Sequence, residues 1–140
     1  MIAIILGSHG KFSKELLKSS EMILGKQENI GYVTLEPGES ADDLVKKYED
    51  LIKNLDIKEG LLFMVDLFGG SPFNAASRIA ITSENIDIVT GVNLPMLLEV
   101  SVSRDFKSLD DIVKTAIDSG LDAIKSFKAN FNDNDEEELE

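Results

Sequence analysis

Short runs of apolar residues recur along the first two thirds of the chain, separated by longer and more polar segments. Each run is too short for a buried helix and is rich in Ile, Val and Leu. Such runs are typical of strands covered on both faces, as in a parallel sheet with helices above and below it. The pattern predicts four strands, over residues 2–6, 30–35, 61–65 and 86–89.

The segments between these runs carry apolar residues at the three- and four-residue spacing of helices. A first helix is expected from Phe12 to a stop at Gly25, and a second follows Ser40, with Asp43 completing a capping box. These two helices lie between the first and second and between the second and third strands.

Three more helices are predicted from their start signals. Ser71 is expected to be the hydroxyl N-cap of the third helix, with Pro72 at its first position. Asn93 opens a short fourth helix, and Ser108 opens a fifth that ends near Gly120.

Strand and helix thus alternate four times, which predicts a doubly wound α/β domain with right-handed crossovers. The expected sheet has four mainly parallel strands in the order 2-1-3-4, with helices on both faces. One domain is expected over residues 1–129. Residues 130–140 are acidic and polar and are predicted to be a disordered tail.

The segment before this tail is ambiguous. Leu121, Ile124 and Phe127 could form one face of a helix. Alternatively, residues 121–127 could lie as an edge strand, on this subunit or on a partner subunit.

Charge and composition exclude several classes of function. The 140 residues include 14 Lys+Arg and 26 Asp+Glu, for a net charge of -12, and six of the acids lie in the last eight residues. The rest of the chain, residues 1–132, is therefore still acidic and would repel the phosphate backbone of a nucleic acid, so no nucleic acid partner is expected. The apolar N-terminus is too short for a signal peptide or a membrane span, which favours a cytoplasmic protein.

The counts of cysteine and histidine narrow the chemistry further. With no cysteine, disulfides, thiolate nucleophiles and iron–sulfur clusters are excluded, and a single histidine excludes metal sites that need two imidazoles. We expect neither a metal nor a cofactor.

The residues that follow the strands are the candidates for a site, because ligands bind beyond the carboxyl ends of parallel strands where the strand order reverses. His9, flanked by Gly7 and Gly10, follows the first strand, and Asp66 follows the third. In the expected order, His9 and Asp66 flank the same crevice. The Gly69-Gly70-Ser71-Pro72 turn then places backbone N–H groups and a hydroxyl at a helix N-terminus, which favours anions.

Each of these features also has a simpler interpretation: His9 as a polar loop residue, Asp66 as a cap and the glycine pair as a plain turn. Together they favour a histidine nucleophile whose second ring nitrogen is held by a carboxylate, with Ser71 and nearby amides on the phosphoryl oxygens. The spacing does not match a serine hydrolase elbow, a receiver aspartate cluster or a P-loop. A flavin site stays open, although few aromatic residues are available to cover the ring.

Three strings of the chain closely resemble the IIA domain of the mannose-type sugar phosphotransferase system, over residues 1 to about 127. They are Ser8-His9-Gly10, Val65-Asp66-Leu67-Phe68-Gly69-Gly70-Ser71-Pro72-Phe73-Asn74-Ala75-Ala76 and Gly91-Val92-Asn93-Leu94-Pro95-Met96.

The resemblance implies that His9 accepts a phosphoryl group from phosphorylated HPr and passes it to a histidine of a IIB component, which serves membrane IIC and IID components. It assigns Asp66 to the orientation of His9 and places Ser71 near the phosphoryl group, with Ser8, Gly69 and Gly70 as further contacts. It also implies a homodimer with a C-terminal strand exchanged between subunits.

The chain departs from the family pattern at Leu67 and Phe68, where some members carry threonine and tryptophan, so a hydroxyl is lost. The acidic tail replaces a linker to a fused IIB domain, which favours a stand-alone IIA subunit. Two alternatives remain, a regulatory module switched by phosphorylation and a phosphocarrier of the dihydroxyacetone kinase type, a branch that lacks the Gly-Gly-Ser-Pro-Phe-Asn string. The sugar is not specified by these residues.

Overall fold

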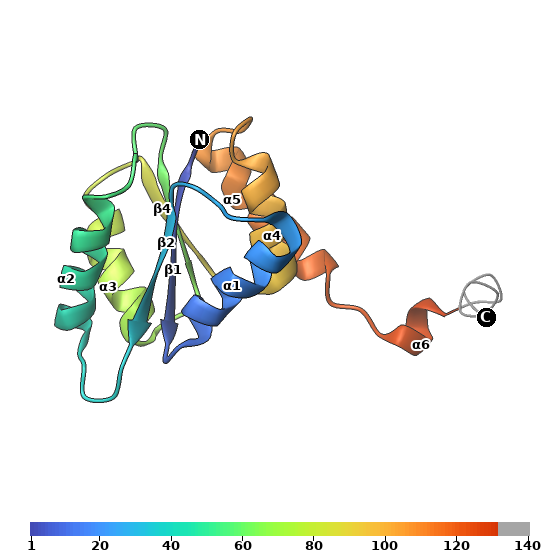
Figure 1. Cartoon of the computed structure of the whole chain (residues 1–140), viewed down its shortest axis with the longest axis horizontal. Helices are drawn as coiled ribbons and strands as arrows, with labels where there is room; N and C mark the ends of the chain where they lie inside the picture. The colour runs from blue at the N-terminus through green and yellow to red at the C-terminus, as the bar shows by residue number, and fades with distance from the viewer. Residues whose placement is uncertain (132–140) are drawn as a thin grey trace.

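A sheet of four parallel strands forms the centre of the fold in the computed structural model, which describes residues 1–131. The strands are β1 (Ala3–His9), β2 (Ile30–Leu35), β3 (Leu61–Val65) and β4 (Ile86–Thr90). The helices are α1 (Phe12–Leu24), α2 (Ala41–Ile52), α3 (Gly70–Ala80), α4 (Leu94–Ser103), α5 (Leu109–Asp122) and α6 (Phe127–Asn130). The strand order is β2-β1-β3-β4, as predicted, so the order reverses between β1 and β3 (Figure 1).

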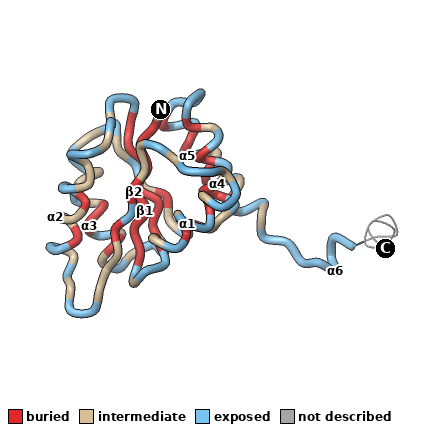
Figure 2. The backbone as a smooth tube through the Cα atoms, in the orientation of Figure 1, coloured by how far each residue is buried: buried red, intermediate tan, exposed pale blue. Residues whose placement is uncertain are grey.

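The two faces of the sheet support two separate apolar cores. Because side chains alternate along a strand, Ile4 of β1 packs in one core and Ile5 in the other. The first core is closed by α1, α4 and α5, and the second by α2 and α3 (Figure 1). Burial accordingly concentrates in β1 and β3 and on the inner sides of these helices (Figure 2). The two covered faces confirm the doubly wound architecture.

Most of the predicted helix starts are confirmed by their hydrogen bonds. Ser40 and Asp43 form both bonds of a capping box at the start of α2. Asn93 accepts a bond from the Met96 amide at the start of α4, and Ser108 caps α5 in the same way.

The predicted start of α3 is wrong. Its N-cap is Gly69, and the helix begins at Gly70, so Ser71 is its second residue and Pro72 its third. The reason is the backbone of the glycine pair, since φ is 89° at Gly69 and 79° at Gly70. Only glycine adopts such angles readily, and the turn they produce lets the helix begin before the serine.

Strand β1 is longer than predicted and continues through His9. It pairs with β2 as far as the His9–Leu35 register position, so His9 ends a strand and is not a loop residue. At the other end of the chain, α5 continues to Asp122 and a short coil leads to α6. Residues 121–131 therefore form no strand within this single chain, and strand exchange with a second copy stays a prediction. Residues 132–140 of the predicted tail lie outside the described residues.

Among residues 1–131, no helix combines the length and the apolar character that crossing a membrane requires.

A buried arginine joins three segments at the end of the sheet where the strands begin. Arg104, at the end of α4, is 1% exposed. Its guanidinium donates hydrogen bonds to the carbonyls of Ile2, Glu28 and Asn29. Burial lowers the pKa of Arg104, and the nearby acids Asp105 and Glu28 oppose that shift. This side chain therefore ties α4 to the start of β1 and to the loop before β2.

Replacing this side chain by an apolar one of similar length should destabilise the fold. Arg104→Met removes the three bonds and leaves three carbonyls without this donor, so we expect the free energy of unfolding to fall by about 2–4 kcal/mol. Urea denaturation followed by circular dichroism measures the change.

The matched control is Arg78→Met, because Arg78 is the other arginine of the chain and its exposed side chain pairs with Asp42 on the surface. We expect this variant to lose less than about 1 kcal/mol. Equal losses in the two variants would contradict the role of Arg104 as a buried tie.

Candidate functional site

The predicted crevice lies where β1 and β3 end side by side. Gly7 pairs with Val65 in the sheet, which brings His9 and Asp66 together just beyond that point. The Nδ1 atom of the His9 ring lies 2.8 Å from Oδ2 of Asp66. The two residues that were selected from the sequence are therefore in direct contact.

The Asp66 carboxylate accepts three N–H groups. Oδ2 accepts the backbone N–H of His9 at 2.8 Å as well as the ring contact, and Oδ1 accepts the backbone N–H of Leu67 at 3.0 Å. The backbone N–H of Asp66 itself donates to the carbonyl of Gly7. These bonds fix the carboxylate relative to the backbone of both strands.

This arrangement determines which ring nitrogen of His9 is nucleophilic. An ionised carboxylate only accepts hydrogen bonds, so Nδ1 of a neutral ring must carry the hydrogen. Nε2 then carries the free lone pair. The His9 side chain is 47% exposed, whereas that of Asp66 is 15% exposed. The ring is therefore accessible from solvent while its orienting partner is largely covered.

The first turn of α3 approaches the Nε2 edge of the ring. A Cβ atom placed on Gly70 would lie 3.1 Å from Cε1 and 3.3 Å from Nε2 of His9. Glycine thus permits close contact between this backbone and the ring. Because the N-cap is Gly69, no side chain among residues 1–131 caps the free N–H groups at this helix start. Free N–H donors at a helix N-terminus favour the binding of an anion there.

The other predicted contact residues differ in their surroundings. Ser71 is half-buried in the first turn of α3, and its hydroxyl forms no hydrogen bond within residues 1–131. The Ser8 hydroxyl is buried, donates to the Gly10 carbonyl and accepts the Ser13 amide. Ser71 therefore has a free hydroxyl, whereas Ser8 is used in connecting β1 to α1.

Tyr48 of α2 is a buried neighbour of the site that the sequence analysis did not select. Its hydroxyl donates to the carbonyl of Pro72, in the first turn of α3, at 3.0 Å. Burial raises the pKa of the Tyr48 phenol, and the charge of Asp66 adds to the shift. A residue 24 positions away in the chain makes this contact, so no local signal could have revealed it.

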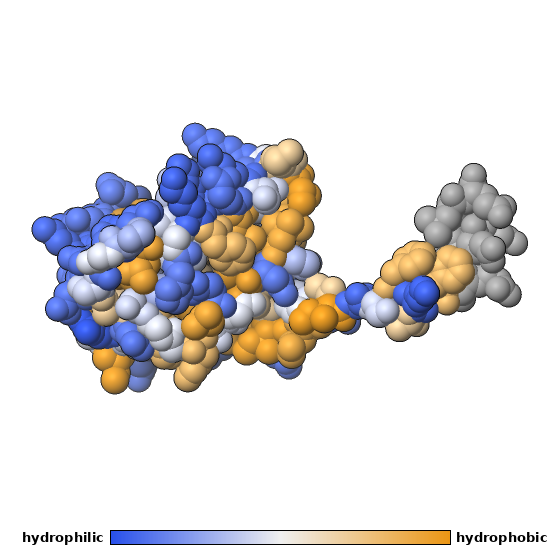
Figure 3. All heavy atoms as spheres, turned by 90° about the horizontal axis from the view of Figure 1, so that it is seen from below, coloured by the Kyte–Doolittle hydropathy of each residue, from blue (hydrophilic) through white to orange (hydrophobic). Residues whose placement is uncertain are grey.

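Large apolar side chains are exposed next to these residues. Phe12 begins α1, and Leu67 and Phe68 follow Asp66, all of them well exposed. Figure 3 looks onto the edge of the sheet where the strands end and shows hydrophobic atoms among hydrophilic ones on this face. Exposed aromatic and aliphatic groups around a reactive side chain are typical of a surface that docks another protein.

The site thus combines an accessible ring nitrogen with a lone pair, a carboxylate that can stabilise a positive charge developing on the ring, and a helix N-terminus beside them. This set can perform nucleophilic attack by imidazole on a group that carries anionic oxygens.

Comparison with known proteins gives a consistent result. The family model for the PTS system fructose IIA component matches residues 3–117. The chain is 46% identical over 129 residues to the PTS system mannose-specific EIIAB component of Escherichia coli strain K12, covering 91% of this chain but 40% of that protein. It is 39% identical over 113 residues to the PTS system fructose-specific EIIA component of Bacillus subtilis, covering 81% of this chain and 77% of that protein.

A solved structure shares the fold over nearly the whole chain. The crystal structure of a phosphotransferase system component EIIA from Streptococcus agalactiae superimposes with a TM-score of 0.84 at 32% identity, covering 92% of this chain and 99% of that one.

The proposed tautomer can be measured directly, because the chain has a single histidine. In ¹⁵N-labelled protein whose His9 ring is neutral, we expect the Nδ1–H tautomer to predominate. Asp66→Asn should lower the population of the Nδ1–H tautomer. Three N–H groups are bound by the two oxygens of Asp66, and an asparagine side chain has only one oxygen to accept them. Long-range ¹H–¹⁵N spectra of the ring measure both populations.

Asp87→Asn is the control, because Asp87 also accepts the backbone N–H of the next residue, Ile88, but lies on β4. It should leave the tautomer of His9 unchanged. A predominant Nε2–H form in the unmodified protein would contradict the proposed orientation.

Proposed function

Because the chain belongs to the family of PTS fructose IIA components, we propose that it is a phosphocarrier of a sugar phosphotransferase system. In this proposal His9 accepts a phosphoryl group from phosphorylated HPr and passes it to a histidine of a IIB component. The observation that carries the proposal is the single accessible imidazole whose Nδ1 is held by Asp66 and whose Nε2 faces the start of α3.

The transfer exchanges one N–P bond for another. Nε2 of His9 attacks the phosphorus of the donor phosphohistidine, and the bond to the donor nitrogen breaks, with its electron pair returning to the donor ring. The proton on Nδ1 stays in place, and Asp66 stabilises the positive charge that develops on the His9 ring. Attack by the IIB histidine on the same phosphorus then restores neutral His9.

The phosphoryl oxygens need hydrogen-bond donors on the Nε2 side of the ring. The start of α3 offers the amides of Gly70 and Ser71. Gly70 lies next to the Nε2 edge of the ring. The Ser71 hydroxyl is a further donor and forms no hydrogen bond within residues 1–131. Gly69 contributes through its backbone, because its positive φ shapes this turn. We assign Ser8 a structural role instead, since its hydroxyl is buried and bonded.

The partners and the location follow from the same assignment. HPr and IIB would dock in turn on the apolar surface that contains Phe12, Leu67 and Phe68, and the membrane IIC and IID components would be served indirectly. Such a carrier works in the cytoplasm. The chain spans 40% of the length of the mannose-specific EIIAB relative, so partners and substrates of that whole protein are carried over here only as proposals.

His9→Ala should abolish phosphoryl transfer and leave the fold intact, because the variant removes the nucleophile from a partly exposed position. The measurement incubates the protein with ³²P-labelled phospho-HPr and then adds a IIB protein. We expect an acid-labile label on the unmodified chain that moves on to IIB, no label on His9→Ala, and equal thermal unfolding temperatures.

Two outcomes would overturn the proposal in different ways. Labelling of His9→Ala would place the nucleophile elsewhere. Label that reaches His9 but never moves to IIB would favour the regulatory module switched by phosphorylation.

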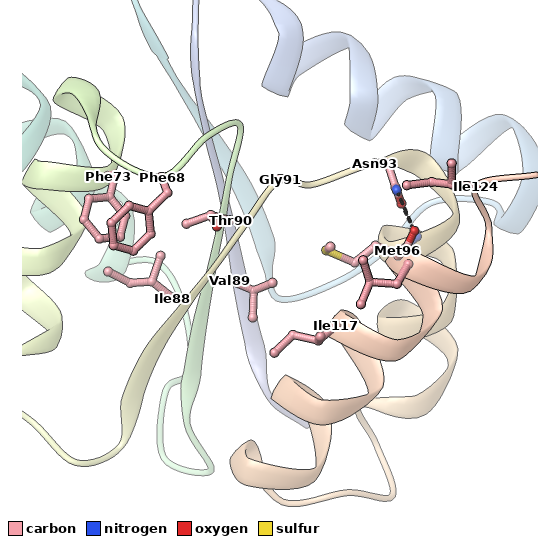
Figure 4. Close-up of a pocket in the computed structure, with 12 residues that line it drawn as sticks. Phe68, Phe73, Ile88, Val89, Thr90, Gly91, Asn93, Met96, Ile117 and Ile124 are labelled. Atoms are coloured by element: carbon pink, nitrogen blue, oxygen red, sulfur yellow. Dashed lines mark hydrogen bonds between the residues drawn. The ribbon is translucent and has the colours of Figure 1, made fainter.

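We also propose that the chain is a homodimer in which residues 121–131 of each copy cover the free edge of β4 in the other. Strand β4 ends the sheet. Beside it lies an apolar groove of about 430 Å³ between Phe68 and Phe73 on one side and Met96, Ile117 and Ile124 on the other (Figure 4). An uncovered sheet edge beside an apolar groove favours the addition of another strand.

The segment that would fill this place projects from the body of the molecule (Figure 1). Ile124, Phe127 and Phe131 are exposed, and Phe127 and Phe131 stack on one another in this chain. Ile124 already lines the groove of its own copy, whereas Phe127 and Phe131 lie farther along the segment and do not line it. A second copy offers these two rings its groove.

Sedimentation equilibrium tests the dimer. We expect a dimer for the unmodified chain, and a monomer for the double variant Ile124→Asp/Phe127→Asp, because burying two carboxylates in an apolar interface is strongly unfavourable. Phe106→Asp is the control, since Phe106 is equally exposed but follows α4 outside the groove. A monomeric unmodified chain, or a dimer that survives the double variant, would contradict this arrangement.

A further inference from the structure

Tyr48 is a buried titratable residue next to the site that the proposed transfer does not use. It is fully buried on α2, and its ring packs edge-on against Phe63 of β3, with 4.9 Å between the ring centroids. The hydroxyl of Tyr48, the one polar group of its side chain, donates to the carbonyl of Pro72. Because burial raises the pKa of the phenol, the hydroxyl remains protonated and stays a donor at any pH at which the protein works.

The segment that Tyr48 holds has one aromatic contact of its own, between the rings of Phe68 and Phe73, whose centroids are 4.5 Å apart. The turn into α3 passes through two successive glycines with positive φ, and no side chain caps the helix. Glycine is the most flexible residue, so a turn built from a glycine pair is held only by its contacts. Pro72 lies two residues after Gly70, and its bond to Tyr48 ties this turn to α2.

The tip of the Tyr48 side chain also touches the strand that carries His9. A Cβ atom placed on Gly7 would lie 2.1 Å from the Tyr48 oxygen and 3.1 Å from its ring carbon Cζ. Gly7 is in β1, two residues before His9. The phenol therefore sits between the end of β1 and the first turn of α3, which are the two segments that face one another across the His9 ring.

We propose that Tyr48 is a positioning residue for phosphoryl transfer, whose hydroxyl sets the distance between the first turn of α3 and Nε2 of His9. It does not touch the phosphoryl group. It acts through Pro72 on Gly70 and Ser71, the residues assigned to the phosphoryl oxygens, so the inference rests on the proposed function.

Tyr48→Phe tests the inference, because it removes the hydroxyl and keeps the ring. We expect the rate constant for transfer from phospho-HPr to fall about tenfold, as the loss of one ordered hydrogen bond allows. The KM for phospho-HPr should not change, since the docking surface is intact. The final yield should stay at one phosphoryl group per chain, which shows that all molecules remain folded and competent.

Two control variants separate positioning from stability. Tyr32→Phe makes the same chemical change on β2, where Tyr32 is exposed, and should leave the rate unchanged. Phe63→Leu loosens the packing of the Tyr48 ring but keeps its hydroxyl, so it should lower the unfolding temperature and keep the rate within about twofold. A rate loss in Phe63→Leu equal to that in Tyr48→Phe would reduce Tyr48 to a packing residue and overturn the inference.

A double-mutant cycle with Gly7→Ala gives an independent readout. In the unmodified background the new methyl group collides with the Tyr48 oxygen, so the hydroxyl must leave its place and the transfer rate should fall at least tenfold. In the Tyr48→Phe background that oxygen is absent. Adding Gly7→Ala to this variant should lower the transfer rate less than about threefold below the rate of Tyr48→Phe alone. Additive losses would show that Gly7 and the hydroxyl act separately, and would overturn the inference.

These experiments also separate this inference from the proposed function. Phosphoramidate, a small phosphoryl donor, is used beside phospho-HPr so that docking does not limit the result. If neither donor labels His9 in the unmodified chain, the proposed function fails. If both label it and Tyr48→Phe transfers at the unmodified rate, the proposed function stands and the role of Tyr48 fails.

Discussion

The site depends on one oxygen atom. Oδ2 of Asp66 accepts both the backbone N–H and the ring Nδ1 of His9, so one carboxylate fixes the end of β1 and the orientation of its last side chain together. This double contact requires that β1 and β3 be neighbours and parallel, which the β2-β1-β3-β4 order provides. A change of strand order would separate the two residues, whatever their positions in the sequence.

Much of this arrangement could be predicted from local patterns. Apolar runs marked the strands, and the rule that ligands bind where the strand order reverses selected His9 and Asp66. The start of α3 could not be predicted, because the angles of Gly69 and Gly70 override the capping preference of Ser71. The role of Tyr48 was also hidden, since its partner Pro72 is distant in the chain and only the packed structure brings them together.

The two ends of the sheet differ in how the backbone is held. Where the strands begin, Arg104 is buried and joins three backbone segments through bonds to their carbonyls. Where the strands end, glycines with positive φ, among them Gly10, Gly69 and Gly70, shape the turns around His9. Glycine lowers stability because it is flexible when unfolded. The three hydrogen bonds of Arg104 stabilise the fold at one end of the sheet, and the glycines at the other end let the backbone come close to a ligand.

The donors assigned to the phosphoryl oxygens suit a group that must leave again. They are backbone amides at the start of α3 and the hydroxyl of Ser71, all of them neutral, and hydrogen bonds from charged groups are roughly twice as strong. An arginine fork at this position would hold the dianion more tightly and would oppose its transfer to the next protein. Asp66 contacts the His9 ring, and in the proposed transfer it does not bind the phosphoryl group. In the proposed transfer between two histidines, a site of modest affinity favours the onward step, so we expect the positions of these donors to matter more than the strength with which each one binds the phosphoryl group.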